Sequence, residues 1–194
     1  MEHLKSVCVY CGSSDRVDER YKAAARNLGR LLANGSFSVV YGGGRVGLMG
    51  ILADSALENK GSVVGIIPSH IREKEVDHPG LTELHVVDNM HSRKMMMFDR
   101  SDAFVILPGG LGTLDETFEI ITWRQLGVHD KPIVLVNLNG YWDALLRMVD
   151  QMIDEGFAND SHRKLFRVVD TVDEVLPALE TEPEPTIAPD AKWM

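Results

Sequence analysis

The stretch PGGLGTLDE, at residues 108–116, combines a bare backbone with side chains that can do chemistry. Gly109, Gly110 and Gly112 leave the main chain nearly uncovered, so that its N–H groups can approach a ligand closely. A helix is expected to follow directly, and the free N–H groups at a helix start bind anions such as phosphate. Thr113 adds a hydroxyl donor. No lysine follows the glycines, as it does in triphosphate-binding loops, so a monophosphate fits better than a polyphosphate.

The role of Glu116 stays open at the level of the sequence. Residues 113–116 read T-x-x-E, the pattern of a capping box in which the glutamate would accept a hydrogen bond from the N–H of Thr113. The other interpretation is a carboxylate that faces a ligand. Glu119 lies one turn further on a similar face of the helix, where it can line the same pocket or be solvated. Both acids are candidate site residues.

A second group of candidates is the basic sequence MHSRK at residues 90–94. His91, Arg93 and Lys94 either bring at least one cation to the mouth of a pocket or form a solvated helix start. Basic residues at a helix N-terminus oppose the helix dipole, which favours the functional interpretation. We therefore expect Arg93 and Lys94 to contact an anionic ligand.

A further glycine-rich stretch, YGGGRVGLMG, follows the second expected strand. Gly42, Gly44 and Gly47 match G-x-G-x-x-G, which in dinucleotide-binding folds commonly follows the first strand and needs an acid about 20 residues later. No acid stands near the end of the third strand, so NAD binding is disfavoured. The glycines either let a helix pack closely or form a backbone wall for a smaller nucleotide. We favour the wall and count Gly43 as a candidate substrate contact.

Alternating strands and helices must position these residues. Most of the expected strands are rich in Val and Ile without polar alternation, which is typical of strands buried on both faces. This pattern predicts an α/β fold with a Rossmann-like, doubly wound parallel sheet and helices on both faces. Residues 1–180 form one expected nucleotide-binding domain, and residues 181–194 an acidic, Pro-rich tail that is expected to be disordered. Since ligands bind outside the carboxyl ends of such strands, CGSS, YGGGRVGLMG and LPGGLGTLDE should converge on one crevice.

Composition excludes several classes of function. The formal net charge of −9 argues against a nucleic-acid partner, which usually requires a basic surface. We find neither an apolar run of roughly 20 residues nor a secretory signal, so we expect a cytoplasmic protein with no membrane partner. Cys8 and Cys11 are two thiols at a strand end, where burial fits better than a redox pair or a zinc site. We expect no metal ion and no organic cofactor.

Taken together, VCVYCGSS, VVYGGGRVGLMG, MHSRK and LPGGLGTLDE resemble, in this order, the signatures of the Lonely Guy family. The resemblance covers roughly residues 4 to 180. Members of this family are cytokinin riboside 5′-monophosphate phosphoribohydrolases, and many are labelled possible lysine decarboxylases. The resemblance implies a Rossmann-like fold, a homodimer, and cleavage of the N-glycosidic bond of a nucleoside 5′-monophosphate to free base and ribose 5-phosphate.

The resemblance also implies roles for individual residues. Arg93 and Glu116 match the residues taken as catalytic, and the glycines and threonine that would hold the phosphate are Gly109, Gly110, Gly112 and Thr113. Leu111 stands where Tyr is frequent and Asp115 where Glu is frequent, which leaves the preferred base open.

Three other functions are weighed against this one. A pyridoxal phosphate decarboxylase would need a Schiff-base lysine, and Lys94 is the only lysine near a motif. A non-catalytic nucleotide sensor would use Glu116 only as a cap. A broad-specificity nucleosidase would hydrolyse AMP, GMP or CMP without a role in cytokinin activation.

Overall fold

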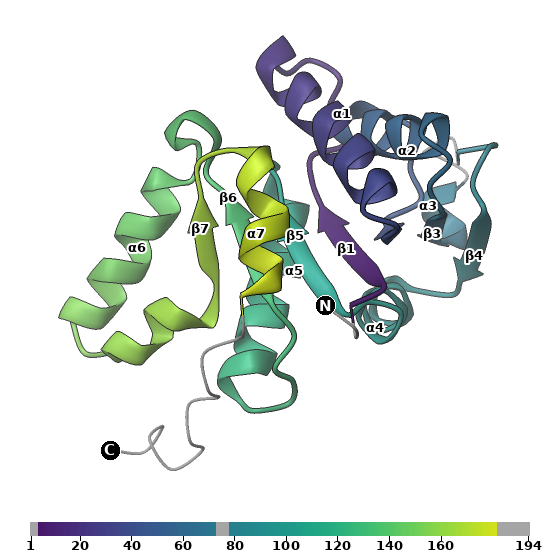
Figure 1. Ribbon diagram of the computed structural model, residues 1–194. Coiled ribbons are helices and arrows are strands. Elements are labelled where there is room, and N and C mark those ends of the chain that lie inside the picture. Colours follow the sequence, from purple (N-terminus) through teal and green to yellow (C-terminus); the bar gives the residue numbers. More distant parts are fainter. Residues whose placement is uncertain (1–3, 73–77, 182–194) are drawn as a thin grey trace.

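The fold is a single seven-stranded sheet in which every paired strand runs parallel (Figure 1). It is seen in a computed structural model that describes residues 4–72 and 78–181. The strand order is β4-β3-β2-β1-β5-β6-β7. The strands are β1 Ser6–Tyr10, β2 Ser38–Tyr41, β3 Val63–Pro68, β4 Glu83–Val87, β5 Ala103–Ile106, β6 Ile133–Val136 and β7 Arg167–Val169. The predicted doubly wound α/β fold is confirmed.

The direction of winding reverses at β1, which pairs with β2 on one side and with β5 on the other. Successive strands are added outward from β1 to β4 and then, on the opposite side, from β5 to β7. In open α/β sheets the crevice beyond the carboxyl ends of the strands at such a reversal is the usual ligand site. The loops after β1 and β5 therefore lie where a ligand is expected.

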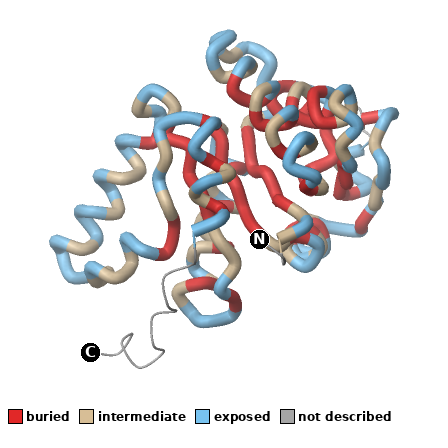
Figure 2. Tube along the Cα trace, viewed as in Figure 1, coloured by how far each residue is buried: buried red, intermediate tan, exposed pale blue. Residues whose placement is uncertain are grey.

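Helices cover both faces of the sheet because successive strand residues point to opposite sides. Val7 and Val9 belong to a core with residues of α1, α2 and α7, whereas Cys8 and Tyr10 belong to a second core with residues of α4 and α5. The buried segments in Figure 2 follow the strands and the inner sides of these helices. The helices of at least ten residues are α1 Glu19–Asn34, α2 Gly47–Glu58, α4 Met90–Asp99, α5 Leu111–Gln125 and α6 Asp143–Asp154; the shorter ones are α3 Ser69–Arg72 and α7 Val175–Glu180.

The strands expected from the sequence agree closely with the observed ones, including the short strand β7 near the C-terminal end of the described chain. The predicted tail lies outside the described residues except for Thr181. Within residues 4–72 and 78–181, no helix combines the length and apolarity needed to cross a bilayer. The same residues contain no cluster of three or more His, Cys, Asp or Glu side chains arranged to hold a metal ion.

Replacing Gly29 with alanine is expected to destabilise the protein by about 1–3 kcal/mol. The new methyl group would meet the carbonyl oxygen of Leu52, where α1 and α2 pack closely. Urea unfolding followed by circular dichroism measures the change. Gly112→Ala is the matched control, because a Cβ on this helical glycine meets nothing within 4 Å. Equal losses of stability in the two variants would contradict the close helix contact.

Candidate active site

Three loops are joined by backbone hydrogen bonds at the carboxyl edge of the sheet. The N–H of Leu48 donates to the carbonyl of Gly12 over 3.0 Å, and the N–H of Gly12 donates to the carbonyl of Pro108 over 3.1 Å. Gly47, at the start of α2, lies so close to the backbone of Ser13 that a Cβ would overlap it. The predicted convergence of the three glycine-rich stretches is confirmed.

The loops and two helix ends enclose a cavity of about 280 Å³. Its lining brings together five of the predicted site residues, namely Arg93, Gly110, Gly112, Thr113 and Glu116. The remaining lining residues are Cys11, Gly12, Ser13, Met49, Met90, Leu111 and Asp115. Thus backbone donors, a cation and a carboxylate from α4, α5 and the β1 and β5 loops meet around one space.

The start of α5 differs from the predicted capping box. The helix begins at Leu111 with Gly110 as its N-cap, and the first helical hydrogen bond runs from the N–H of Leu114 to the carbonyl of Gly110 over 3.0 Å. Thr113 is therefore inside the first turn, where it is buried and packs against Gly109. The capping interpretation of Glu116 is wrong, because the helix starts three residues earlier than the T-x-x-E pattern requires.

The earlier helix start exposes backbone donors to the cavity. The N–H groups of Leu111, Gly112 and Thr113 have no acceptor within the helix, because the first helical hydrogen bond is made by the N–H of Leu114. A Cβ on Gly110 or Gly112 would meet nothing within 4 Å, so both glycines border open space. The dipole of α5 adds positive potential at this end. This arrangement suits an anion such as a phosphate.

Glu116 is a buried carboxyl group with an unusual proton affinity. Only 12% of its side chain is exposed. Burial raises its pKa to about 7, against the opposing effect of Arg93 and with a smaller contribution from Asp115 in the same direction. Burial disfavours the charged form of this carboxyl in the free protein, so a positive charge placed next to it stabilises the carboxylate strongly. Glu116 is thus suited to interact with a cationic group in the cavity.

Arg93 is held beside Glu116 without being fully satisfied. Its Nη2 lies 3.9 Å from Oε1 of Glu116, its Nη1 lies 3.8 Å from the sulfur of Met90, and its buried Nε has no hydrogen-bond partner in the described part of the chain. The guanidinium also lies where a Cβ on Gly42 would be. The alternative of a solvated basic helix start is wrong for Arg93 and Lys94, which are both buried, and fits only the exposed His91.

Lys94 bridges two carboxylates next to Glu116. Its Nζ lies 3.2 Å from Oδ2 of Asp115 and 3.0 Å from Oε1 of Glu119. Burial by itself lowers the pKa of Lys94, but the hydrogen bonds to Glu119 and Asp115 outweigh it, so that the pKa is raised. Neither Lys94 nor Glu119 lines the cavity. The structure therefore brings both close to the site but behind its wall.

Two further predictions concern residues around the cavity. Gly43 has a positive φ of 78°, and a Cβ there would press on Ile66 and Ile67, so its glycine is explained by packing; it does not line the cavity. Cys8 and Cys11 are buried as expected, and burial raises the pKa of both thiols well above the usual range. Cys11 also lines the cavity, as a protonated thiol at neutral pH.

Sequence reasoning missed the apolar part of the lining. Met49 and Met90 come from helices whose glycine and basic motifs drew attention, and their apolar side chains gave no signal of their own. Leu111 is 85% exposed at the cavity, although it is a large apolar residue. Exposure of this kind is visible only once the chain is folded.

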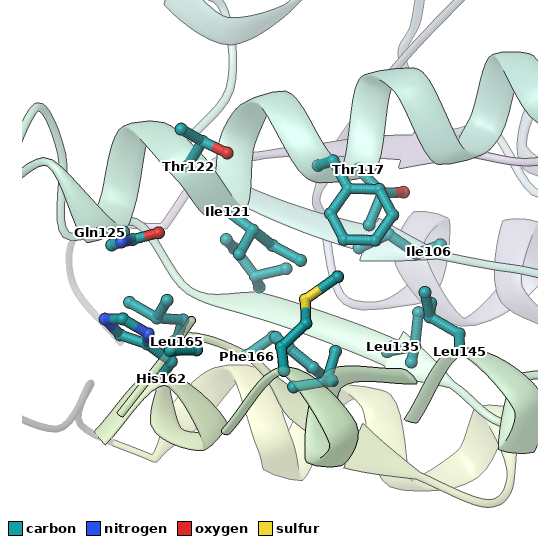
Figure 3. A pocket seen from close by; sticks show the side chains of 15 residues that line it. Ile106, Thr117, Ile121, Thr122, Gln125, Leu135, Leu145, His162, Leu165 and Phe166 are labelled. Atoms are coloured by element: carbon teal, nitrogen blue, oxygen red, sulfur yellow. The ribbon is translucent and has the colours of Figure 1, made fainter. Parts of the chain in front are cut away.

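A second cavity, of about 210 Å³, lies further along α5, between α5 and α6, and is lined mainly by apolar side chains (Figure 3). Ile121 of α5 and Leu145 of α6 contribute to it from opposite sides, and Phe166 closes part of it. It contains neither Arg93 nor Glu116. Its lining offers no group suited to acid–base or charge chemistry besides His162.

Comparison with known proteins identifies the family. Residues 49–179 match the family described as possible lysine decarboxylase. A probable cytokinin riboside 5′-monophosphate phosphoribohydrolase of Oryza sativa subsp. japonica is 48% identical over 163 residues, which cover 84% of this chain and 72% of that protein. The cytokinin riboside 5′-monophosphate phosphoribohydrolase of Rhodococcoides fascians is 44% identical over 178 residues, 91% of this chain and 90% of that one. The chain belongs to the Lonely Guy family.

Solved structures support the fold of this Lonely Guy protein. The molybdenum cofactor binding protein of Rippkaea orientalis superimposes with a TM-score of 0.69 over 93% of this chain and 98% of that one. The sequence identity is 17%, so the likeness shows the shared architecture alone.

The buried carboxyl of Glu116 is expected to make stability depend on pH. Its pKa of about 7 exceeds the ordinary 4.5, so the folded state binds the proton more tightly and wild-type stability falls as the pH rises through that window. At 1.36 kcal/mol per pKa unit the loss is about 3 kcal/mol above pH 7. Glu116→Gln should abolish this loss, as measured by urea unfolding at a series of pH values.

The matched control is Glu58→Gln, which removes an exposed carboxyl at the end of α2. Its unfolding free energy should follow the wild-type pH dependence. If Glu116→Gln shows the same pH dependence as wild type and Glu58→Gln, the carboxyl of Glu116 titrates in its ordinary range and the account of its burial is wrong.

Proposed function

We propose that this protein hydrolyses the N-glycosidic bond of a nucleoside 5′-monophosphate, AMP or an N6-modified AMP, and releases the free base and ribose 5-phosphate. The observation that carries the proposal is a buried carboxyl of raised pKa, Glu116, in one cavity with the uncovered N–H groups at the start of α5. An anion at those N–H groups and a cation at Glu116 are the two charges that such a substrate presents in the transition state.

The phosphate would sit at Gly110, Gly112 and Thr113, which offer backbone donors and a hydroxyl at the positive end of a helix. Gly109 serves this turn by packing against Thr113, where no Cβ fits. With the phosphate there, the ribose extends along α5 towards Glu116, one turn further on. The acid thus faces the sugar and not the phosphate.

Cleavage of the glycosidic bond leaves positive charge on the ribose ring, in an oxocarbenium-like state. The Glu116 carboxylate stabilises that charge. The bond between C1′ and the base nitrogen breaks, a water oxygen bonds to C1′, and the proton that the water loses balances the one that the leaving base takes up. Because the surroundings have already excluded water from the carboxylate, its attraction for the developing cation is stronger than in solvent. Arg93 completes the site by neutralising phosphate charge or supporting the leaving base.

Two other activities fit the geometry less well. A Schiff base needs a neutral amine, whereas the two carboxylates beside Lys94 favour its charged form and hold it outside the cavity lining. A sensor in which Glu116 only caps its helix has lost its structural basis, because Glu116 lies beyond the first turn of α5. Lys94 and Glu119 are proposed to act on the substrate through the charge of Glu116.

Location and assembly are part of the proposal. We propose a cytoplasmic location and a homodimer. The homodimer is inferred because α6 has no buried residue and exposes Met148 and Met152 beside the apolar cavity between α5 and α6. Light scattering coupled to gel filtration should give twice the mass of one chain, because pairing would remove this apolar surface from water. A monomer at micromolar concentration would contradict the dimer.

Glu116→Gln is expected to lower kcat for AMP by at least about a hundredfold, because the amide keeps the shape of the side chain and loses the charge that stabilises the transition state. Base release followed by chromatography measures it, with Glu58→Gln as the control that should retain wild-type activity. If Glu116→Gln retained most of kcat with unchanged stability, Glu116 would not be catalytic.

The substrate is tested by incubating the wild type with AMP, GMP, CMP and prenylated AMP and measuring each free base. We expect release from AMP or prenylated AMP, with an equal amount of ribose 5-phosphate. Comparable rates on all four would favour a broad nucleosidase, and binding without any release would favour a sensor.

A further inference from the structure

The hydroxyl of Tyr141 reaches the phosphate-binding turn from a distant part of the chain. It donates to the carbonyl of Gly109 over 2.7 Å, although the two residues are 32 positions apart and Tyr141 is 41% exposed. An exposed tyrosine hydroxyl ordinarily bonds water, so a direct bond to one particular carbonyl requires that the ring be held in place.

The ring is held by the turn after β6 and by aromatic neighbours. Asn139 and Gly140 both have positive φ, 51° and 72°, which turns the chain sharply just before Tyr141. The ring then packs edge-on against Trp142, with centroids 4.8 Å apart, and against Tyr21 of α1, at 5.5 Å. These contacts involve only the ring and would persist without the hydroxyl.

The turn itself is fixed by the buried side chain of Asn137. Its Oδ1 accepts from the N–H of Trp142 over 2.7 Å, and its Nδ2 donates to Asp143 over 2.8 Å. A Cβ on Gly140 would meet the Asp143 carboxylate, so this glycine also lets the turn close. The turn and the ring contacts therefore hold the hydroxyl of Tyr141 in position independently of its hydrogen bond to Gly109.

The bonded carbonyl belongs to the peptide group whose N–H is on Gly110. In a trans peptide the C=O and the N–H point in opposite directions, and the described residues contain no cis bond. With its carbonyl held by Tyr141, this peptide directs the Gly110 N–H away from the tyrosine. Gly110 lines the cavity, so that N–H is available to a ligand there.

A peptide between two glycines is the one most free to rotate as a unit, because neither flanking residue restricts φ and ψ through a Cβ. The preceding carbonyl, of Pro108, is already fixed by the N–H of Gly12. The Gly109–Gly110 peptide is thus the remaining variable element of the turn, and the Tyr141 hydroxyl selects one of its orientations.

We propose that Tyr141 is a positioning residue for phosphate, which orients the Gly110 N–H through its hydrogen bond to the Gly109 carbonyl. The proposal rests on the proposed function in that it assigns the phosphate to this turn. It adds a residue from outside the glycine motif and predicts an effect confined to the binding of the phosphate group.

The test is Tyr141→Phe, which keeps the ring contacts and removes only the hydroxyl. We expect KM for AMP to rise roughly tenfold with kcat within about twofold, and the affinity for ribose 5-phosphate and for inorganic phosphate, measured by calorimetry, to fall by a similar factor. The melting temperature should stay close to wild type. Tyr21→Phe is the control, since the Tyr21 hydroxyl has no hydrogen bond in the described residues, and it should behave as wild type.

Unchanged KM and unchanged phosphate affinity in Tyr141→Phe would overturn the proposal. A lowered kcat together with a lowered melting temperature would overturn it as well, because it would indicate a structural role only. If the wild type binds ribose 5-phosphate but does not hydrolyse AMP, the proposed function fails, and the calorimetric comparison still decides the role of Tyr141. If the wild type binds neither ribose 5-phosphate nor phosphate, both proposals fail.

Discussion

The burial of the Glu116 carboxyl beside an incompletely paired guanidinium is the interaction on which the rest of the site depends. The two groups are 3.9 Å apart, the pKa of Glu116 is raised to about 7 in spite of Arg93, and the Nε of Arg93 has no partner in the described residues. A buried pair with good geometry would lower the pKa of the acid and satisfy the arginine. Incomplete pairing of this kind is costly in a protein interior and is typical of functional sites.

The fold maintains this arrangement from several directions. Arg93 and Glu116 stand on the helices that precede and follow β5 in the chain, and Gly42 leaves the space that the guanidinium occupies. Lys94 balances the acids Asp115 and Glu119, which would otherwise add to the negative potential around Glu116. The reversal of the sheet at β1 and β5 then brings the uncovered turn of α5 to the same crevice. The proposed phosphate site and the buried carboxyl that is proposed to face positive charge thus lie about one helical turn apart.

Much of this could be predicted from the sequence, because the signals are local. Buried strands read as Val-rich runs, glycines mark the strand ends, and parallel strands necessarily bring those ends to one edge. The true start of α5 could not be predicted, because it depends on Thr113 packing against Gly109 within the folded turn. The contact from Tyr141 to the Gly109 carbonyl could not be predicted either, since it joins segments 32 positions apart through a single hydroxyl. Lys94 was expected at the ligand, and only the fold reveals that two acids from the next helix hold it behind the cavity wall.

The most direct test of the account is a crystal structure of the Glu116→Gln variant with AMP bound. We expect the 5′-phosphate at the N–H groups of Gly110 and Gly112, with C1′ of the ribose facing residue 116. A nucleotide bound in the opposite direction, with its base at the glycine turn and its phosphate away from the start of α5, or one bound in the apolar cavity between α5 and α6, would contradict it.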